Sequence, residues 1–327
     1  MSRVSHRAGR ATLAGIALLL AAFAVFPWAF ASKLNFGFSL VLFAALATSW
    51  DLLGGWAGQL SLGHTAFVGL GAYVSTLLWT KAGIPLGWGL LVAMLAGIAL
   101  ALVWGAITFR RRGAYFSLSS IAVAEVLRIV ANNWVSLTNG PEGLSLNDLQ
   151  PLLGFDLYDR RVEYYLALAL LAAALFASWR IGSSRAGFYL EAIREDQDSS
   201  MALGVNPLKM KLAAYCLSAA LCSACGCLYG IYLSSFEPQS VFSLDLSIQL
   251  VLIAIVGGMG TVFGPVLGAV ALLGSQEAFR NVFQKRSLLI YGIVIVIIVR
   301  FAPDGLLGRL RVLLRRAPWA SRLPSGP

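Results

Sequence analysis

The sequence predicts an all-α, polytopic membrane protein with about ten transmembrane helices. Of its 327 residues, 58% are hydrophobic and only 12% are charged, whereas soluble domains carry about 25% charged residues. The mean hydropathy is +0.77. A helix needs about 20 apolar residues to cross a bilayer, so the chain has room for roughly ten spans with short loops. We therefore expect a single transmembrane domain over 1–327 and exclude a soluble enzyme.

Apolar runs separated by glycine, proline or charged residues define the expected spans. In chain order these runs are 11–30, 36–54, 59–79, 85–109, 113–137, 162–180, 212–233, 246–263, 264–280 and 287–302. The breaks at 54–58 and 263–265 are consistent with tight hairpins or with interruptions inside helices.

The first span has a competing interpretation as a cleavable signal peptide. A basic start, an apolar stretch and Ala29-Phe30-Ala31 before Ser32 are typical of such a leader. The apolar run is long for a signal peptide, so we expect residues 1–31 to be retained as a span. Cleavage would leave nine spans and an outside N-terminus.

The net charge of +10 would suggest nucleic acid in a soluble protein, but the arginines flank apolar segments. With both termini cytoplasmic, the inside segments hold three basic residues in the N-terminal tail, three at 110–112, five at 180–211 and six at 300–322. The outside segments hold seven, and Arg128 lies within a span. This asymmetry follows the positive-inside rule. It predicts two cytoplasmic termini, an even number of spans and a basic cytoplasmic tail over 303–327.

Several chemistries are excluded by what the sequence lacks. None of its five lysines follows glycine and precedes serine or threonine, so the phosphate-binding loop of P-loop ATPases is missing. Its only histidines are His6 and His64, which excludes a multi-histidine metal site within one chain. Cys216, Cys222, Cys225 and Cys227 are read as small buried residues of one helix.

Two glycine-rich stretches interrupt the apolar pattern. The first runs from Asp51 to His64 and the second from Gly257 to Gly268. Glycine permits close helix packing and unwound backbone, and interrupted segments in both halves of a transporter point to its binding region. The expected packing or hinge residues are Gly54, Gly55, Gly58, Gly63, Gly257, Gly258, Gly260, Gly264, Pro265 and Gly268.

The span 113–137 is unusually polar. Glu125 and Arg128 are three residues apart, which allows an ion pair on one helix face. Ionisable groups at this depth face a partner or a wet pathway rather than lipid, so a structural lock and a pathway role both stay open. The candidates for the translocation path, chosen for polarity inside apolar spans, are Asp51, Gln59, Ser61, His64, Glu125, Arg128, Asn132 and Asn133.

The longest expected cytoplasmic loop covers 181–211. Residues 186–203 contain good helix formers, and Gly204 and Pro207 supply a stop. The residues predict a short, mostly polar surface helix that serves either as a connector or as a docking element.

Several motifs closely resemble those of one family. They are Gly58–His64, Glu125–Arg128 with Asn132–Trp134, Thr138–Gly143, Ala192–Asp196, Ala202–Asn206 and Gly257–Pro265. Over about 36–308, the chain resembles the M-type permease subunit of bacterial branched-chain amino acid ABC importers.

The resemblance implies a type II importer-like permease in the inner membrane. Its implied partners are a homologous H-type permease, two cytoplasmic ATPases that carry ATP and Mg, and a periplasmic binding protein. The chain itself is then non-catalytic and binds no cofactor and no metal. The resemblance also makes 181–211 the coupling loop. There Asp198-Ser199-Ser200 aligns with the usual Glu-Ala-Ala, so that the charge is kept and both alanines become serine, and Gly204 keeps the usual glycine. The coupling residues carried over are Glu191, Ala192, Arg194, Glu195, Asp196, Asp198, Ser199, Ser200 and Gly204.

Alternatives remain at this point. Permeases for urea, amides or other small solutes share the family. A secondary transporter driven by protons or sodium would use Asp51, Glu125 or His64 as its titrating group. A membrane-embedded enzyme is disfavoured, because paired carboxylates or a His and Cys cluster at catalytic spacing are not found in the sequence.

Overall fold

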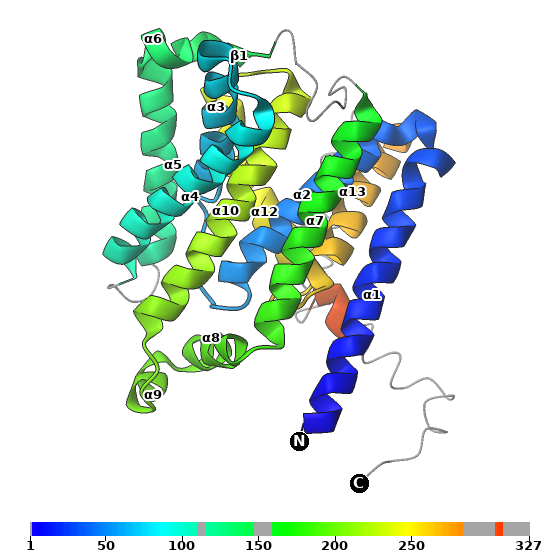
Figure 1. Cartoon of the computed structure of the whole chain (residues 1–327), viewed down its shortest axis with the longest axis vertical. Coiled ribbons are helices and arrows are strands. Elements are labelled where there is room, and N and C mark those ends of the chain that lie inside the picture. Colours follow the sequence, from blue (N-terminus) through cyan, green and yellow to red (C-terminus); the bar gives the residue numbers. More distant parts are fainter. Residues whose placement is uncertain (1, 110–114, 147–158, 284–304, 310–327) are drawn as a thin grey trace.

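The computed structural model describes residues 2–109, 115–146, 159–283 and 305–309. Long helices run between two ends of a bundle (Figure 1). The long helices are α1 (Ser2–Ala29), α2 (Leu34–Gly54), α3 (Thr65–Ala82), α4 (Leu86–Thr108), α5 (Tyr115–Asn133), α7 (Arg160–Gly182), α10 (Pro207–Leu233), α12 (Leu244–Gly257) and α13 (Gly264–Phe283).

Short elements mark the two ends of the bundle. At one end lie η1 (Ala31–Lys33), α6 (Val135–Thr138), η2 (Gly140–Glu142), α11 (Pro238–Val241) and the antiparallel pair of β1 (Leu144–Ser145) and β2 (Ser235–Phe236). At the other end lie α8 (Arg185–Glu195) and α9 (Gln197–Ala202). We call these the β1 end and the α8 end; α1 begins at the α8 end (Figure 1).

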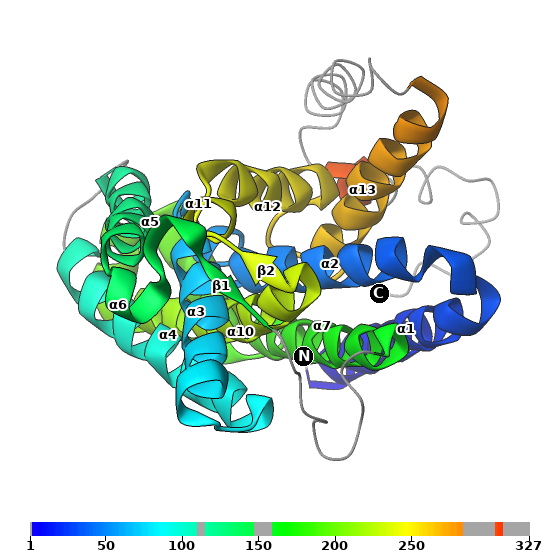
Figure 2. The ribbon, with the colours of Figure 1, turned by 90° about the horizontal axis from the view of Figure 1, so that it is seen from above.

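Two helices form the centre of the bundle. In the most apolar 18 residues of α2 and α10, 83% and 72% of the residues are buried, against 11% in α1 and 22% in α4. Seen from above, α2 runs between α13 and α7 (Figure 2). Their many alanines allow close packing, and hydroxyls such as Thr48, which donates to the Ala44 carbonyl at 2.7 Å, are satisfied within their own helix. The outer helices expose large apolar side chains such as Leu95 and Val103, as expected of a lipid-facing surface.

The helical, multi-span class predicted from composition is confirmed. Seven helical segments among the described residues are long and apolar enough to cross a membrane, and each of the first nine expected spans overlaps a long helix. The expected span at 287–302 lies outside the described residues.

Several helix boundaries differ from the prediction, and three of them have a plain physical reason. The third helix begins at Thr65 rather than at 59, because 55–64 is irregular, and α12 ends at Gly257 rather than at 263. After α12, Gly258 and Gly260 adopt positive φ values of 118° and 70°, which ends the helix. Helix α10 begins at Pro207, five residues early, because the Asn206 side chain caps it by accepting from the Lys209 N–H at 3.1 Å.

Candidate functional site

The first glycine-rich stretch is an irregular segment over 55–64, which we call break 1. Helix α10 lies between α2 and α3 and packs against both, so break 1 is not the turn of a tight α2–α3 hairpin. Side chains from other helices satisfy its backbone. Ser117 of α5 donates to the Leu60 carbonyl at 2.6 Å, and the Leu62 N–H donates to Ser120 at 3.0 Å. Irregular backbone at membrane depth is stable only when protein or enclosed water satisfies it in this way.

The second stretch is a short turn over 258–263, which we call break 2, between two helices that pack closely together. Within it, Thr261 donates to the Gly258 carbonyl at 2.7 Å and accepts from the Gly264 N–H at 3.1 Å. The Gly260 N–H of this turn donates to both carboxylate oxygens of Asp51, at 2.9 and 3.1 Å. Asp51 is fully buried at the end of α2, so this contact joins the two breaks.

A cationic side chain from α8 reaches the same place. Arg194 Nη1 donates to the Gly55 carbonyl of break 1 at 2.9 Å. The guanidinium also lies beside Gly260 of break 2 and attracts the Asp51 carboxylate electrostatically. Asp51, Gly55, Gly260 and Arg194 therefore form one cluster at the α8 end, which we call the arginine junction.

The loop 181–211 folds into two helices rather than the single helix expected over 186–203. Asp196 separates them, because its carboxylate caps α9 by accepting from the N–H groups of Asp198 at 2.9 Å and Ser199 at 3.3 Å. The Ser199 hydroxyl donates to the same carboxylate, and these bonds, the Ser199 hydroxyl first, hold the pKa of Asp196 below its ordinary value. Gly204 then turns the chain with a φ of 85°.

Helices α8 and α9 together with Leu203, residues 185–203, form what we call the α8–α9 unit. This unit exposes large apolar side chains although it lies outside the long helices. Leu203 is 84% exposed and Phe188 is 69% exposed, with Tyr189 and Met201 also exposed. Leu190 and Ile193 are instead buried against the bundle. An open groove of about 540 Å³ runs beside Met201 and Gly204. Among the other residues expected in the coupling loop, Ser200 is buried, and the exposed ones are Glu191, Ala192, Glu195, Asp198 and Ser199.

Three of the eight path candidates are buried around the end of α2. Besides Asp51, these are Ser61 and His64. His64 Nε2 lies 2.9 Å from Ser218 Oγ, and the Ser218 hydroxyl donates to the Ser49 carbonyl at 2.6 Å. That serine proton is used, so His64 donates from Nε2. Among the described residues, His64 Nδ1 and Ser61 Oγ are buried without a hydrogen-bond partner.

The other five candidates reach the surface of the chain. Glu125 and Arg128 form the expected ion pair on α5, with Arg128 Nε donating to the carboxylate at 2.8 Å. Asn133 is exposed and donates to the Ile129 carbonyl at 2.8 Å. Gln59 and Asn132 are half-buried. The structure therefore places the candidates in a buried group and a surface group and does not gather them into one site.

The expected packing glycines serve several close approaches. A Cβ at Gly257, Gly264 or Gly268 would lie 1.8 to 2.1 Å from a backbone oxygen of the α12–α13 hairpin, and one at Gly63 would lie 1.7 Å from the Ser120 carbonyl of α5. At Gly54 the Cβ would meet the Trp50 ring, and Gly305 packs against Gly258. Pro265 follows Gly264 in the first turn of α13.

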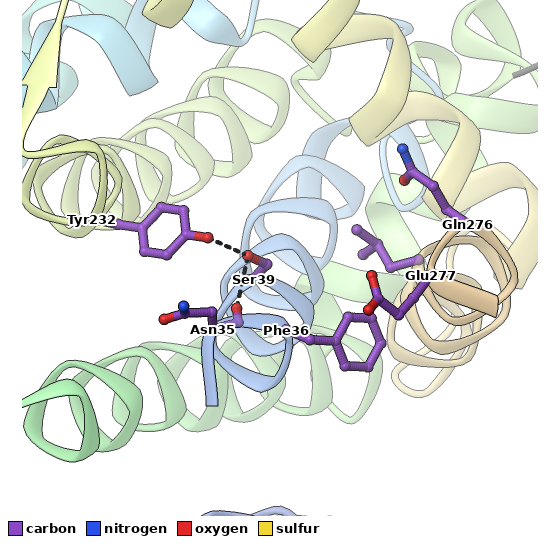
Figure 3. A pocket seen from close by; sticks show the side chains of 7 residues that line it. Asn35, Phe36, Ser39, Tyr232, Gln276 and Glu277 are labelled. Carbon is purple, nitrogen blue, oxygen red and sulfur yellow. Dashed lines mark hydrogen bonds between the residues drawn. The ribbon is translucent and has the colours of Figure 1, made fainter. Parts of the chain in front are cut away.

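Sequence reasoning missed a pocket at the β1 end, which we call the outer pocket. It holds about 230 Å³ between α2, α10 and α13 (Figure 3) and is lined by Asn35, Phe36, Ser39, Tyr232, Leu273, Gln276 and Glu277. The Ser39 hydroxyl lies 3.1 Å from the Asn35 carbonyl and 3.2 Å from the Tyr232 hydroxyl. The only available sequence signal was the presence of polar residues near the ends of three apolar runs, which are far apart in the chain.

Among the residues that the structure describes, no group of three His, Cys, Asp or Glu side chains is placed to hold a metal. Cys222, Cys225 and Cys227 are buried in α10. Together, the apolar bundle and its buried polar breaks define a multi-span membrane protein.

Comparison with known proteins identifies the kind of membrane protein. Residues 32–299 match the family model for "branched-chain amino acid transport system / permease component". The chain is 30% identical over 298 residues to the high-affinity branched-chain amino acid transport permease LivM of Salmonella typhimurium, and equally to that of Escherichia coli K12. Each alignment covers 84% of this chain and 70% of the relative. BraD of Pseudomonas aeruginosa is 24% identical over 83% of this chain and 92% of its own length. No solved structure matches.

The chain therefore belongs to the permease family of branched-chain amino acid ABC transporters. This confirms the family suggested by the sequence motifs.

Proposed function

We propose that this chain is the M-type permease subunit of an ABC importer that moves branched-chain amino acids into the cytoplasm. The observation that carries the proposal is the family match over 32–299 together with the relatives' named transport function. In this assembly an H-type permease completes the path, two ATPase subunits bind ATP and Mg, and a periplasmic protein delivers the solute. The whole chain acts as one permease domain in the inner membrane and binds no cofactor or metal itself.

The charge pattern and the fold support a cytoplasmic α8 end. This end holds the start of α1 and the α8–α9 unit (Figure 1). The N-terminal tail and the segment 180–211 each carry three arginines. Lys81 and Arg160, counted as outside residues, lie at the β1 end: Lys81 donates to the Ser136 carbonyl of α6 at 2.6 Å, and the Arg160 guanidinium lies 5.5 Å from the ring centre of Tyr232. The positive-inside rule then places the N-terminus and the 303–327 tail in the cytoplasm.

The α8–α9 unit has the features of an ATPase docking element. Exposed apolar patches outside the lipid region mark protein interaction sites, and Phe188 and Leu203 give this unit exposed apolar surface. The groove beside Met201 gives the partner a recess.

Gly204→Pro tests this docking role. Proline fixes φ near −65°, whereas Gly204 has a φ of 85°, so the turn between α9 and α10 cannot form. In reconstituted complexes, we expect stimulation of ATP hydrolysis by the leucine-loaded binding protein to fall at least tenfold. Gly83→Pro, at a matched φ of 63° at the β1 end, is the control for general damage. Wild-type stimulation in the Gly204 variant would contradict the docking role.

The outer pocket supports a zwitterionic solute with an aliphatic side chain. Its Glu277 carboxylate suits an ammonium group, its amide and hydroxyl groups suit a carboxylate, and Phe36 and Leu273 offer apolar surface. Its volume lies below the roughly 300–1,000 Å³ of pockets for drug-sized ligands, which suits a small solute. We expect Glu277→Gln to raise the leucine concentration needed for half-maximal uptake at least fivefold, with little change in the maximal rate. Glu142→Gln, the same change at an exposed position of η2 at the β1 end, is the control.

The unpartnered buried atoms of Ser61 and His64 support a pathway beside break 1. Leaving such atoms unpaired costs about 1–3 kcal/mol each, a cost that solute or water in another transport state would remove. In a background without native cysteines, cysteines at Ser61 and His64, which are buried here, should react with small water-soluble thiol reagents. Protection of both would contradict this assignment.

Uptake energetics distinguish the proposal from a secondary transporter. In proteoliposomes that hold the full complex, leucine uptake should require ATP on the side of the membrane that the α8 end faces. Uptake should continue when the proton and sodium gradients are collapsed. Uptake that needs only an ion gradient would favour Asp51, Glu125 or His64 as a titrating group instead.

A further inference from the structure

Arg194 contacts both glycine-rich breaks from the coupling loop. Its Nη1 donates to the Gly55 carbonyl in break 1 at 2.9 Å. A Cβ built on Gly260 of break 2 would lie only 3.0 Å from the same nitrogen. One side chain of α8 therefore touches two irregular segments that are more than 200 residues apart in the chain.

The glycines of both breaks leave the space that this side chain occupies. A Cβ at Gly58 would lie 2.4 Å from Arg194 Cγ, and one at Gly55 would lie 2.0 Å from the Asp51 carboxylate and 2.3 Å from the Gly260 nitrogen. Larger residues at Gly55, Gly58 or Gly260 would displace the Arg194 side chain or the Asp51 carboxylate. These glycines therefore make room for the Arg194 side chain in addition to allowing close helix packing.

Asp51 connects the two breaks on the inner side of the junction. Its buried carboxylate accepts from the Gly260 N–H, and a buried carboxylate is stable only with hydrogen bonds or a nearby cation. Arg194 is the cation that attracts it. On its solvent side, Arg194 lies 3.5 Å from the carboxylate of Glu195, which is 75% exposed. The guanidinium is therefore held between the bundle and the loop surface.

We propose that Arg194 is a positioning residue that transmits movement of the α8–α9 unit to breaks 1 and 2. The proposal rests on the assignment of α8–α9 as the ATPase docking element. A docked ATPase that displaces α8 pulls the Gly55 carbonyl and alters the charge balance at Asp51. Both breaks then adjust together, because they are irregular backbone rather than helix. The ends of α2, α12 and α13 next to the breaks move with them.

The test uses the complete reconstituted complex and compares Arg194→Gln, Arg194→Lys and Arg180→Gln. Arg180→Gln removes the same charge from an exposed position at the end of α7. The measurements are co-purification of the ATPase subunits, ATP hydrolysis with and without leucine-loaded binding protein, and the number of leucines imported per ATP hydrolysed.

We expect Arg194→Gln to assemble and to lower both the stimulation and the leucine-to-ATP ratio at least fivefold. Arg194→Lys keeps the charge but not the planar donor group and should restore part of the ratio, while Arg180→Gln should match the wild type. An assembled Arg194→Gln complex with a wild-type ratio overturns the proposal. Failure of both Arg194 variants to assemble shows a purely structural role and also overturns it.

A second measurement does not depend on transport. In the purified permease, hydrogen–deuterium exchange of the amides in 55–63 and 258–263 should rise in Arg194→Gln and not in Arg180→Gln. Unchanged exchange in both breaks overturns the junction itself. By contrast, leucine uptake by the wild-type complex that is independent of ATP would refute the proposed function, whatever the exchange shows.

Discussion

The two glycine-rich breaks have similar compositions but use glycine for different purposes. Break 1 joins α2 and α3, which are separated by α10, and its irregular backbone is held by side chains of α5 and α8. Break 2 joins α12 and α13, which pack directly, and the glycines around it bring backbone against backbone. Glycine in break 1 mainly makes room for other elements, whereas around break 2 it allows two helices to touch. The segment of break 1 is adjustable, whereas the α12–α13 contact beside break 2 is rigid.

The largest effect should come from filling the rigid contact. A Cβ at Gly268 would lie 1.9 Å from the Ile253 carbonyl oxygen and 2.9 Å from the Gly257 nitrogen, and neither backbone atom can move cheaply. Gly268→Ala should therefore destabilise the protein by about 3 kcal/mol, at the upper end for overpacking. The measurement is the thermal unfolding midpoint of the detergent-solubilised protein.

Gly274→Ala is the matched control within α13, because a Cβ there meets nothing within 4 Å. It should be neutral or stabilise by about 0.5–1 kcal/mol, the usual helix-interior difference between glycine and alanine. Equal midpoints for the two variants would show that the α12–α13 contact accommodates an added methyl group at Gly268.

An intermediate effect is expected in break 1. Gly58 has a φ of 66°, and its added Cβ would crowd the flexible part of Arg194, 2.4 Å away at Cγ. Alanine in this left-handed conformation costs about 1 kcal/mol, and displacing the arginine should add about another 1 kcal/mol, the value of a typical hydrogen bond.

Gly83→Ala isolates the backbone contribution. Gly83 has nearly the same φ, 63°, but a Cβ there meets nothing within 4 Å. Urea or thermal unfolding should show a loss about twice as large for Gly58→Ala as for Gly83→Ala. Identical losses would mean that Arg194 moves aside without cost, which would weaken the distinction between the two breaks.

The sequence predicted the positions of the spans and of both breaks, because long apolar runs and clustered glycines are local signals. It did not predict which contacts the glycines make. The contact of Asp51 with Gly260 joins residues 209 positions apart, and Arg194 reaches both from a loop that is polar by composition. The spacing of residues along the chain does not indicate which distant residues come into contact. The outer pocket was missed for the same reason, since Asn35, Tyr232 and Glu277 come from three separate helix ends.

Local capping chemistry explains the errors at helix boundaries. Residues 186–203 contain many good helix formers, yet Asp196 ends one helix and caps the next, because its carboxylate satisfies the free N–H groups of α9. Likewise, 59–64 continues an apolar run but is held as irregular backbone by α5 hydroxyls. In both places a side chain competes successfully with helical hydrogen bonding.

The smallest expected effect concerns one hydroxyl that supports break 1. Ser117 of α5 donates to the Leu60 carbonyl of break 1 at 2.6 Å. Ser119 instead donates to the Phe116 carbonyl of its own helix at 2.9 Å. Removing the Ser117 hydrogen bond should cost about 1 kcal/mol. The Ser119 hydroxyl bonds only within α5 and does not touch break 1. Ser117→Ala should therefore raise hydrogen–deuterium exchange of the amides at 58–63, and Ser119→Ala should not. Equal exchange in both variants would show that break 1 is held by its other contacts alone, and that Ser117 does not contribute to keeping this adjustable segment in place.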